Sequence, residues 1–391
     1  MQRDLQLYIR VIGRYTPYLK HNSITPFCFF HSLRNESIYF GGNERALEFI
    51  VPTSIDGLEF LADGKPMCVT TISAFVNKEI DSWANNFREK ILLNAPLRVD
   101  LSTLAENCAD DGPLVSFATL TQDRRNGLDW SSVLMTAWQQ SGVFSQFLAT
   151  DGTFIVPRIR EYLVEYEEHK VMLGALCEWV LGMPSRGSEL VTMRHANGRD
   201  GQLRNMYLMR DHVCTIIDYS KTTAMLGRLK SILRVMPQRV GEIVALELLA
   251  VHPVRDIFYT ILQQPEPGAP LAPLPAQMST MYFTDFHGAV ITASRISEKM
   301  KFLTNREFGL RYGHQKWRHV MIHIGRKGSS LIAELADQMV KQSGHSAITS
   351  SQRYARDGQS IGGLTRMELF NFFEQSKNMH ALLKLDLEMS Q

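Results

Sequence analysis

Two short runs of apolar and β-branched residues, 213–219 and 231–236, stand in a chain whose other apolar residues recur mainly at helical spacing. A turn-like stretch around Lys221 separates the two runs, so together they predict a β-hairpin. Apolar residues three and four positions apart predict helices over 69–93 and 130–148. The sequence therefore predicts an α+β fold that is mainly helical and contains a small β-sheet.

The chain has 391 residues, which is enough for two or three domains. From about residue 155 onward, β-branched runs occur among the helical patterns. We therefore expect a mostly helical N-terminal domain over 1–150 and a mixed domain over 151–391. Inside the second domain, residues 264–277 contain five prolines and predict a loop or an extended tether. A second loop is expected at the polar stretch 107–113. Further helical patterns cover 161–181, 240–251 with a stop near Pro253, 331–342, and 365–386.

Positive charge is unevenly distributed along the chain. The formal net charge is +2, but Lys and Arg minus Asp and Glu gives −3 for residues 1–150 and +5 for 151–391. Residues 301–327 carry seven basic side chains and one acid, Glu307. A local basic surface suits contact with phosphates, although a solvated surface explains it equally well. The seven basic residues are Lys301, Arg306, Arg311, Lys316, Arg318, Arg326 and Lys327.

Several classes of site lack their sequence signatures. No Cys-x-x-Cys pair, no His-Glu-x-x-His and no Gly-x-x-x-x-Gly-Lys-Ser/Thr loop occurs, so we expect no metal and no ATP site. No apolar run approaches the ~20 residues of a membrane span, so we expect no membrane partner. The five cysteines are far apart and predict reduced thiols: Cys28, Cys68, Cys108, Cys177 and Cys214.

Four residues in distinctive settings follow one another along the second predicted domain. Arg186 stands in Ser-Arg-Gly-Ser-Glu-Leu, and Arg318 stands in Lys-Trp-Arg-His. His345 follows a glycine, and Tyr354 lies nine positions after His345. The planar fork of a guanidinium suits the charge that builds on a phosphate under attack, and a tyrosine can attack the phosphorus to hold the strand covalently. This order is typical of a site that cuts a phosphodiester without metal or ATP.

These motifs resemble those of the tyrosine recombinase family. Arg186 with Glu189 resembles the first arginine motif, which opens a helix in that family. Arg318 resembles the arginine of the second box, and His345 with Tyr354 resembles the histidine box and the nucleophile at the usual interval. The resemblance covers roughly the second predicted domain and implies a helical N-terminal domain that clamps DNA together with a recombinase catalytic domain.

The resemblance also implies a role for each residue. Arg186, Arg318 and His345 would hold the scissile phosphate, and Tyr354 would form a 3′-phosphotyrosine. A lysine of the hairpin would protonate the leaving 5′ oxygen. We favour Lys221 for this role, and Lys230 is the alternative.

One position departs from the family pattern. The family has His or Lys three residues before the second arginine, and here that residue is Gln315. Glutamine can bind a phosphate but cannot exchange a proton at neutral pH. Either the role is relaxed in this chain or a neighbour, His314 or Lys316, takes it over. Further DNA contacts are expected from Gln315, Lys316, His319 and Lys230.

Within the family the chain looks most similar to Crypton-type recombinases of eukaryotic mobile elements. That resemblance rests on Tyr219-Ser-Lys-Thr, on Ile232-Leu-Arg-Val-Met-Pro and on the Tyr354-Ala-Arg tail. It implies double-stranded DNA as the partner, no cofactor, a homo-tetramer on two DNA sites, excision and integration of DNA, and a nuclear location. The last helical pattern, with Phe370 and Phe373, is expected either to dock on a neighbouring copy or to pack within its own chain.

Other interpretations fit single residues. The spacing of Arg186 and Glu189 also fits an ordinary ion pair on a helix surface. His345 also fits a helix cap, and Tyr354 also fits a half-buried core tyrosine. Two rival functions share the motifs: a type IB topoisomerase that relaxes supercoils, and a DNA-binding protein that descends from a recombinase and no longer cuts.

Overall fold

The computed structural model describes residues 50–106, 115–123, 129–219, 230–264, 273–328, 364 and 366–385. By their contacts the residues form two units, one of Met1–Ile55 with Glu59–Pro66, and one of Asp56–Leu58 with Met67–Gln391. In the first unit, β1 (Ile50–Pro52) pairs antiparallel with β2 (Glu59–Ala62). The next strand, β3 (Lys65–Cys68), completes a three-stranded sheet.

The second unit is mainly helical with small antiparallel sheets, as the sequence predicts. Its helices are α3 (Val69–Asn86), α4 (Phe117–Leu120), α5 (Trp130–Gln140), α6 (Val156–Val180), α7 (Gly187–Leu190), α9 (Gln238–Leu246), α10 (His252–Leu262), α11 (Ala276–Thr280), α12 (Ala293–Phe308), α13 (His314–Gly328) and α15 (Arg366–Leu382). Short turns of other helix types are η2 (Phe87–Ile91), η3 (Leu101–Thr103), η4 (Val143–Phe147) and η5 (Glu247–Val251). Its remaining strands are β4 (Leu104–Glu106) and β5 (Thr121–Asp123), which pair with each other, and β6 (Met206–Met209), β7 (His212–Tyr219) and β8 (Lys230–Val235).

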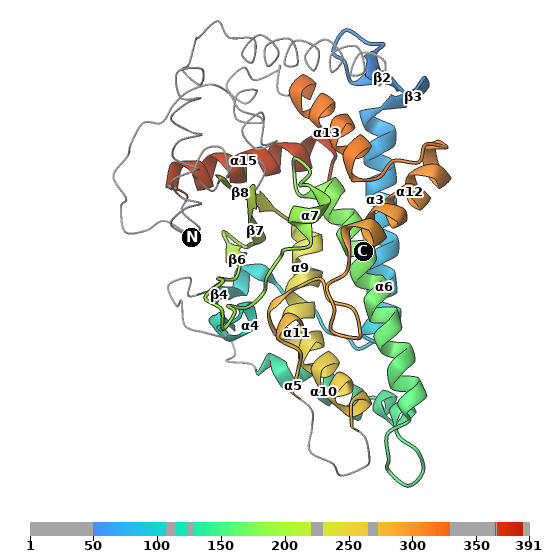
Figure 1. The fold of residues 1–391 in the computed structure, drawn as a ribbon, viewed down its shortest axis with the longest axis vertical. Helices are drawn as coiled ribbons and strands as arrows, with labels where there is room; N and C mark the ends of the chain where they lie inside the picture. The colour runs from blue at the N-terminus through green and yellow to red at the C-terminus, as the bar shows by residue number, and fades with distance from the viewer. Residues whose placement is uncertain are drawn as a thin grey trace, which may run out of the picture. The chain divides into compact units, whose positions relative to one another are not determined.

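The core of the second unit forms around α6, which runs beside α3 and also contacts α10, α12 and α13 (Figure 1). Three tryptophans from different helices, Trp83, Trp179 and Trp317, are fully buried there. The ring of Phe75 lies 4.8 Å from that of Trp179 and 6.3 Å from that of Trp317, between ring centroids. Large aromatic side chains contribute much of the apolar burial in a core. This packing fixes the start of α13 against α6.

The hairpin predicted from the two β-branched runs is confirmed. β7 pairs antiparallel with β8, from Tyr219 opposite Lys230 to Cys214 opposite Val235. β6 pairs with the other edge of β7, so the sheet order is β6-β7-β8. Successive side chains of a strand point to opposite faces, so this sheet has two distinct faces to cover.

α15 covers one face of this sheet within its own chain (Figure 1). Phe372 and Phe373 are buried in one cluster with Leu233 and Val235 of β8, whereas Phe370 is 44 % exposed. Phe373 therefore packs within the chain, and docking of α15 on a neighbouring copy stays a prediction.

Three details differ from the sequence-based expectations. The helix expected over 130–148 ends at Gln140, and a separate 3₁₀ turn, η4, follows it. α9, η5 and α10 follow one another without a break, so the helix does not stop near Pro253. This proline closely follows the π turn η5, where the chain leaves regular α-helical geometry. The proline-rich loop was predicted too long, because α11 already begins at Ala276. Residues 265–272, the loop 107–113 and the helix 331–342 lie outside the described residues.

The helices on either side of residue 150 pack together. α3 and α6 are in contact, and Met67–Gln391 form one unit. Packing alone does not decide where a domain ends, because neighbouring domains of one chain also pack. The boundary expected at residue 150 stays a prediction. Within the described ranges, no helix combines the length and the apolar character needed to cross a membrane.

A carboxylate lies in the middle of the helical core. Glu247, in the π turn η5, is fully buried and accepts hydrogen bonds from the hydroxyls of Tyr166 and Tyr282, the latter at 2.6 Å. Its oxygens lie 3.7 Å from Lys170 Nζ and 3.6 Å from His252 Nε2. Burial by itself would raise the pKa of Glu247, but contacts with His169, at 3.4 Å, and with His252, together with the charge of Lys170, lower it well below its ordinary value. The charge of Glu247 therefore holds α6, α10 and the segment after α11 together.

Candidate active site

Arg186 lies between the turn that ends α6 and the start of α7. Its amide donates a 3.0 Å hydrogen bond to Glu189 Oε2, and its guanidinium Nη1 lies 3.6 Å from Glu189 Oε1. The Glu189 side chain is buried, whereas the Arg186 side chain is 30 % exposed. Glu189 thus contacts both the backbone and the head of Arg186, and the prediction that this motif opens a helix is confirmed for the short α7.

His314, the first residue of α13, packs against α7. A Cβ on Gly187 would lie 2.6 Å from the His314 ring, so this close approach requires glycine. The ring Nε2 lies 3.0 Å from the Ala293 carbonyl oxygen, and Nδ1 lies 3.6 Å from Glu178 Oε1. The hydroxyl of Ser185 donates a 2.8 Å hydrogen bond to the same Glu178 oxygen. α6, the turn before α7 and the start of α13 therefore meet at one buried carboxylate.

These surroundings favour the protonated form of His314. Burial opposes the positive charge, but the Glu178 carboxylate and the Ala293 carbonyl outweigh burial and raise the pKa of His314. Both ring nitrogens face acceptors inside the protein. His314 is therefore poorly placed to substitute for Gln315, which is exposed on α13 together with Lys316 and His319.

We expect the replacement His314→Ala to lower the free energy of unfolding more at about pH 5.5 than at about pH 8.5. A histidine whose folded pKa is raised contributes stability that is fully present below the unfolded pKa, near 6.5, and is lost as pH rises through the folded pKa. The loss at low pH should be on the order of 1–3 kcal/mol. Urea unfolding at both pH values measures it, with the exposed His287→Ala as the control. An equal loss at both pH values would contradict a charged His314.

Arg318 lies one helical turn after His314 on α13. The preceding Trp317 is fully buried against Phe75 and Trp179, and Arg318 itself is half-buried. A buried tryptophan at the adjacent position limits how far this part of the helix can move. The Arg318 guanidinium is therefore carried by a well-packed backbone.

Sequence reasoning missed a third arginine, Arg234 of β8. Leu233 and Val235 pack toward α15, so Arg234 projects from the other face of the sheet, beside its cross-strand neighbour Thr215. Its side chain is 1 % exposed. Burial and the nearby charge of Arg318 lower the pKa of Arg234 to about 10, while Glu178 and Glu189 oppose this shift. The available signal was a lone arginine inside the apolar run 231–236.

The structure places two of the predicted residues, Arg186 and Arg318, next to a contact between α7 and α13: Gly187 follows Arg186, and its contact His314 lies one turn before Arg318. Arg186 pairs with Glu189, and the charges of Glu189 and Arg318 both affect the pKa of Arg234. Lys230 is the first residue of β8, but the position of its side chain lies outside what the structure describes. The three remaining predicted residues, Lys221, His345 and Tyr354, lie outside the described residues altogether.

Part of the basic stretch is paired with acids. Lys301 Nζ lies 2.7 Å from Glu298 Oε1, and Arg311 Nη2 lies 3.6 Å from Glu298 Oε2. Arg306 forms an ion pair with Glu79 of α3. These three basic residues are therefore partly neutralised, and the positive surface is weaker than the sequence count suggests. Lys316 stands over the ring of Tyr312, 5.4 Å from its centroid.

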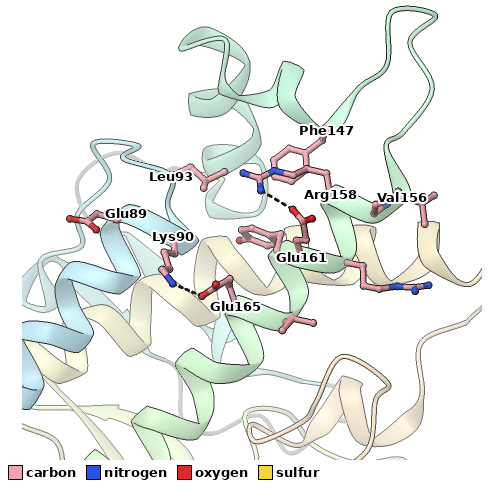
Figure 2. A pocket seen from close by; sticks show the side chains of 12 residues that line it. Glu89, Lys90, Leu93, Phe147, Val156, Arg158, Glu161 and Glu165 are labelled. Carbon is pink, nitrogen blue, oxygen red and sulfur yellow. Dashed lines mark hydrogen bonds and ion pairs between the residues drawn. The ribbon is translucent and has the colours of Figure 1, made fainter.

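A surface pocket of about 750 Å³ lies elsewhere, beside the first half of α6 (Figure 2). Four of its charged side chains are paired: Lys90 with Glu165 at 2.9 Å and Arg158 with Glu161 at 3.0 Å. None of the predicted site residues lines it. The pocket therefore adds nothing to the candidate site around Arg186 and Arg318.

In comparisons with known proteins, no family model, no curated protein and no solved structure matches this chain.

Proposed function

We propose that this chain is a tyrosine recombinase, which cuts and rejoins double-stranded DNA through a 3′-phosphotyrosine. The observation that carries the proposal is that Arg186 and Arg318, from motifs far apart in the sequence, lie beside one cluster of charged side chains, where His314, one turn before Arg318, packs on Gly187. Guanidinium groups remain charged at any physiological pH and can bind phosphate oxygens in pairs. The cluster supports a site for one phosphate, with Arg186 and Arg318 as its donors.

The proposed reaction conserves the number of phosphodiester bonds. The Tyr354 phenol oxygen attacks phosphorus and forms a P–O bond, the P–O5′ bond breaks, and the phenol proton passes to solvent. Lys221, or Lys230 in its place, donates a proton to the leaving 5′ oxygen. His345, Arg186 and Arg318 balance the charge on the non-bridging oxygens. A 5′-hydroxyl of another strand then reverses the steps, so no external energy source is required.

The resemblance to Crypton-type recombinases extends this proposal to excision and integration of DNA in the nucleus, by a homo-tetramer on two DNA sites. Gln315 is exposed and can donate a hydrogen bond to a phosphate, but it cannot move a proton. We therefore expect proton transfer to depend on the hairpin lysine alone.

A pool of nicked duplexes with randomised sequence tests the proposal without knowledge of the DNA target. Cleavage near the nick releases a short fragment, so rejoining is blocked and the covalent complex accumulates. Denaturing gels should show a protein–DNA band in the presence of a chelator, and the band should be lost in Tyr354→Phe. DNA that shifts on a native gel without any covalent band would instead identify a DNA-binding protein.

The DNA sequences recovered from the covalent complex then distinguish a recombinase from the remaining rival, a type IB topoisomerase. A plasmid that carries two recovered sites should yield recombinant products with the wild-type protein. Relaxation of supercoils without recombinants would favour a type IB topoisomerase over a recombinase.

A further inference from the structure

Two contacts flank Arg186, one on each side along the chain. The hydroxyl of Ser185 donates a 2.8 Å hydrogen bond to Glu178 Oε1, near the end of α6. On the other side, Gly187 lies so close to the His314 ring that a Cβ there would meet Cδ2 at 2.6 Å and Nε2 at 2.7 Å. Non-bonded carbon atoms prefer separations of ~3.5–4.0 Å, so the backbone beside Arg186 is packed directly on this ring.

The His314 ring cannot move away from Gly187 without losing partners on two other helices. Its Nε2 donates a 3.0 Å hydrogen bond to the carbonyl of Ala293, the first residue of α12, and its Nδ1 lies 3.6 Å from Glu178 Oε1. The same Glu178 oxygen accepts the hydrogen bond from Ser185. The Glu178 side chain is fully buried and the His314 side chain is 14 % exposed, so water replaces neither partner readily. The ring is thus held from α6 and α12 while it supports the start of α7.

The backbone around His314 is confined as well. A Cβ on Gly313 would collide with the Ser297 hydroxyl of α12 and would lie 3.2 Å from Lys301 Cε. The amide of Trp317 donates a 3.0 Å hydrogen bond to the Gly313 carbonyl, and the Trp317 side chain is fully buried. The first turn of α13 therefore has little room to shift against α12.

These contacts connect the two arginine motifs through one side chain. His314 lies one helical turn before Arg318, and Gly187 is the residue after Arg186. Residues four apart in an α-helix lie on the same face, so the ring and Arg318 share one side of α13. A change in the size of the side chain at position 187 or 314 should therefore change the spacing between the two motifs.

We propose that His314 is a positioning residue that acts as a spacer: its ring, packed on Gly187 and held by Glu178, sets the distance between the motifs of Arg186 and Arg318, so that both guanidinium groups reach one phosphate. The phosphate in this inference rests on the proposed function, whereas the coupling of α7 to α13 through the ring does not. His314 does not touch the DNA and transfers no proton, because both of its ring nitrogens face acceptors inside the protein.

Gly187→Ala tests the spacing directly. The added methyl group must displace the ring, so single-turnover, Tyr354-dependent cleavage at saturating DNA should fall about 10²-fold, the loss expected when reacting groups are misplaced by about 1 Å. The DNA concentration for half-saturation should change little, because the variant removes no DNA contact. The matched control is Gly241→Ala in α9, another buried glycine, where the nearest contact of a Cβ would be Leu101 at the ordinary separation of 3.4 Å. Its cleavage rate should stay close to that of the wild type.

A double-variant cycle shows whether the loss passes through the ring. His314→Ala removes the ring and makes room for the added methyl group, so Gly187→Ala should cost little further cleavage rate in that background. An equal loss in both backgrounds would mean that Gly187 acts without the ring, and would overturn the proposal. A Gly187→Ala protein that cleaves at the wild-type rate, or whose only defect is in DNA affinity, would overturn it as well.

Ser185→Ala adds no bulk and serves if Gly187→Ala does not fold. It removes the hydrogen bond by which Glu178 holds the chain before Arg186. The cleavage rate at saturating DNA should fall by up to about tenfold, the equivalent of one hydrogen bond, with DNA affinity nearly unchanged. A wild-type rate would contradict the part assigned to Glu178.

Urea unfolding provides a readout that needs no activity. The losses in unfolding free energy for Gly187→Ala and His314→Ala should be far less than additive in the double variant, because the same contact is removed in each. If the wild-type protein forms no Tyr354-dependent complex, the proposed function fails, and this cycle still decides whether the ring couples α7 to α13. Fully additive losses would overturn that coupling.

Discussion

Replacing Arg318 with alanine is expected to lower the rate of Tyr354-dependent DNA cleavage by about 10²- to 10³-fold at saturating DNA. The guanidinium of Arg318 would stabilise charge that develops on the phosphate during attack, and such an interaction acts mainly on the rate of the chemical step. Arg318→Lys keeps the charge but loses the planar fork, so it should fall between wild type and alanine.

Single-turnover measurement of the covalent complex gives this rate directly. The matched control is Arg311→Ala, which removes an exposed arginine of the same basic stretch that is paired with Glu298. Its cleavage rate should stay within about threefold of wild type once DNA is saturating, because exposed pairs contribute little. Equal losses in both variants would mean that Arg318 only contributes to general DNA affinity.

Replacing Glu247 with alanine is expected to lower the free energy of unfolding by about 3–5 kcal/mol, the largest effect on stability predicted for this chain. The variant leaves Lys170, whose pKa burial already lowers to about 7, without its closest carboxylate. It also leaves the hydroxyls of Tyr166 and Tyr282 without the acceptor that they share. Each buried polar group that loses its partner retains the cost of its removal from water.

Urea unfolding of Glu247→Ala and Glu247→Gln measures this loss. Glu247→Gln keeps the shape and some hydrogen bonds but not the charge. Its loss of stability therefore measures the contribution of the charge, and the additional loss in Glu247→Ala measures that of the hydrogen bonds and packing. Glu307→Gln, at an exposed pair with Lys78, should change stability by no more than about 1 kcal/mol. A Glu247 variant as stable as this control would show that the buried cluster contributes nothing to the fold.

Local patterns predicted much of the fold. The apolar and β-branched runs 213–219 and 231–236 predicted the β7–β8 pair, and Arg186 with Glu189 predicted the start of α7. Such features depend on residues that are neighbours in sequence. The helix through Pro253 was missed because the π turn before it and the packing around α10 outweigh the local signal of the proline.

The buried charged groups were harder to predict. The sequence around Arg234 predicts only a strand. The fold brings its guanidinium within range of the charges of Glu178 and Glu189, which affect its pKa. The partners of Glu247 come from α6, α10 and the segment at Tyr282, and no local spacing connects them. Conversely, the nine-residue interval between His345 and Tyr354 is visible only in the sequence, and their arrangement stays a prediction.

The central claim is that Tyr354 attacks DNA, and mass spectrometry of the trapped complex tests it most directly. The covalent complex from nicked duplexes would be digested with protease and nuclease, and the modified peptide sequenced. The account predicts that the peptide with Tyr354 carries a nucleotide through its 3′ phosphate, while the released strand ends in a 5′ hydroxyl. A nucleotide on another residue, or a linkage to a 5′ phosphate, would contradict it.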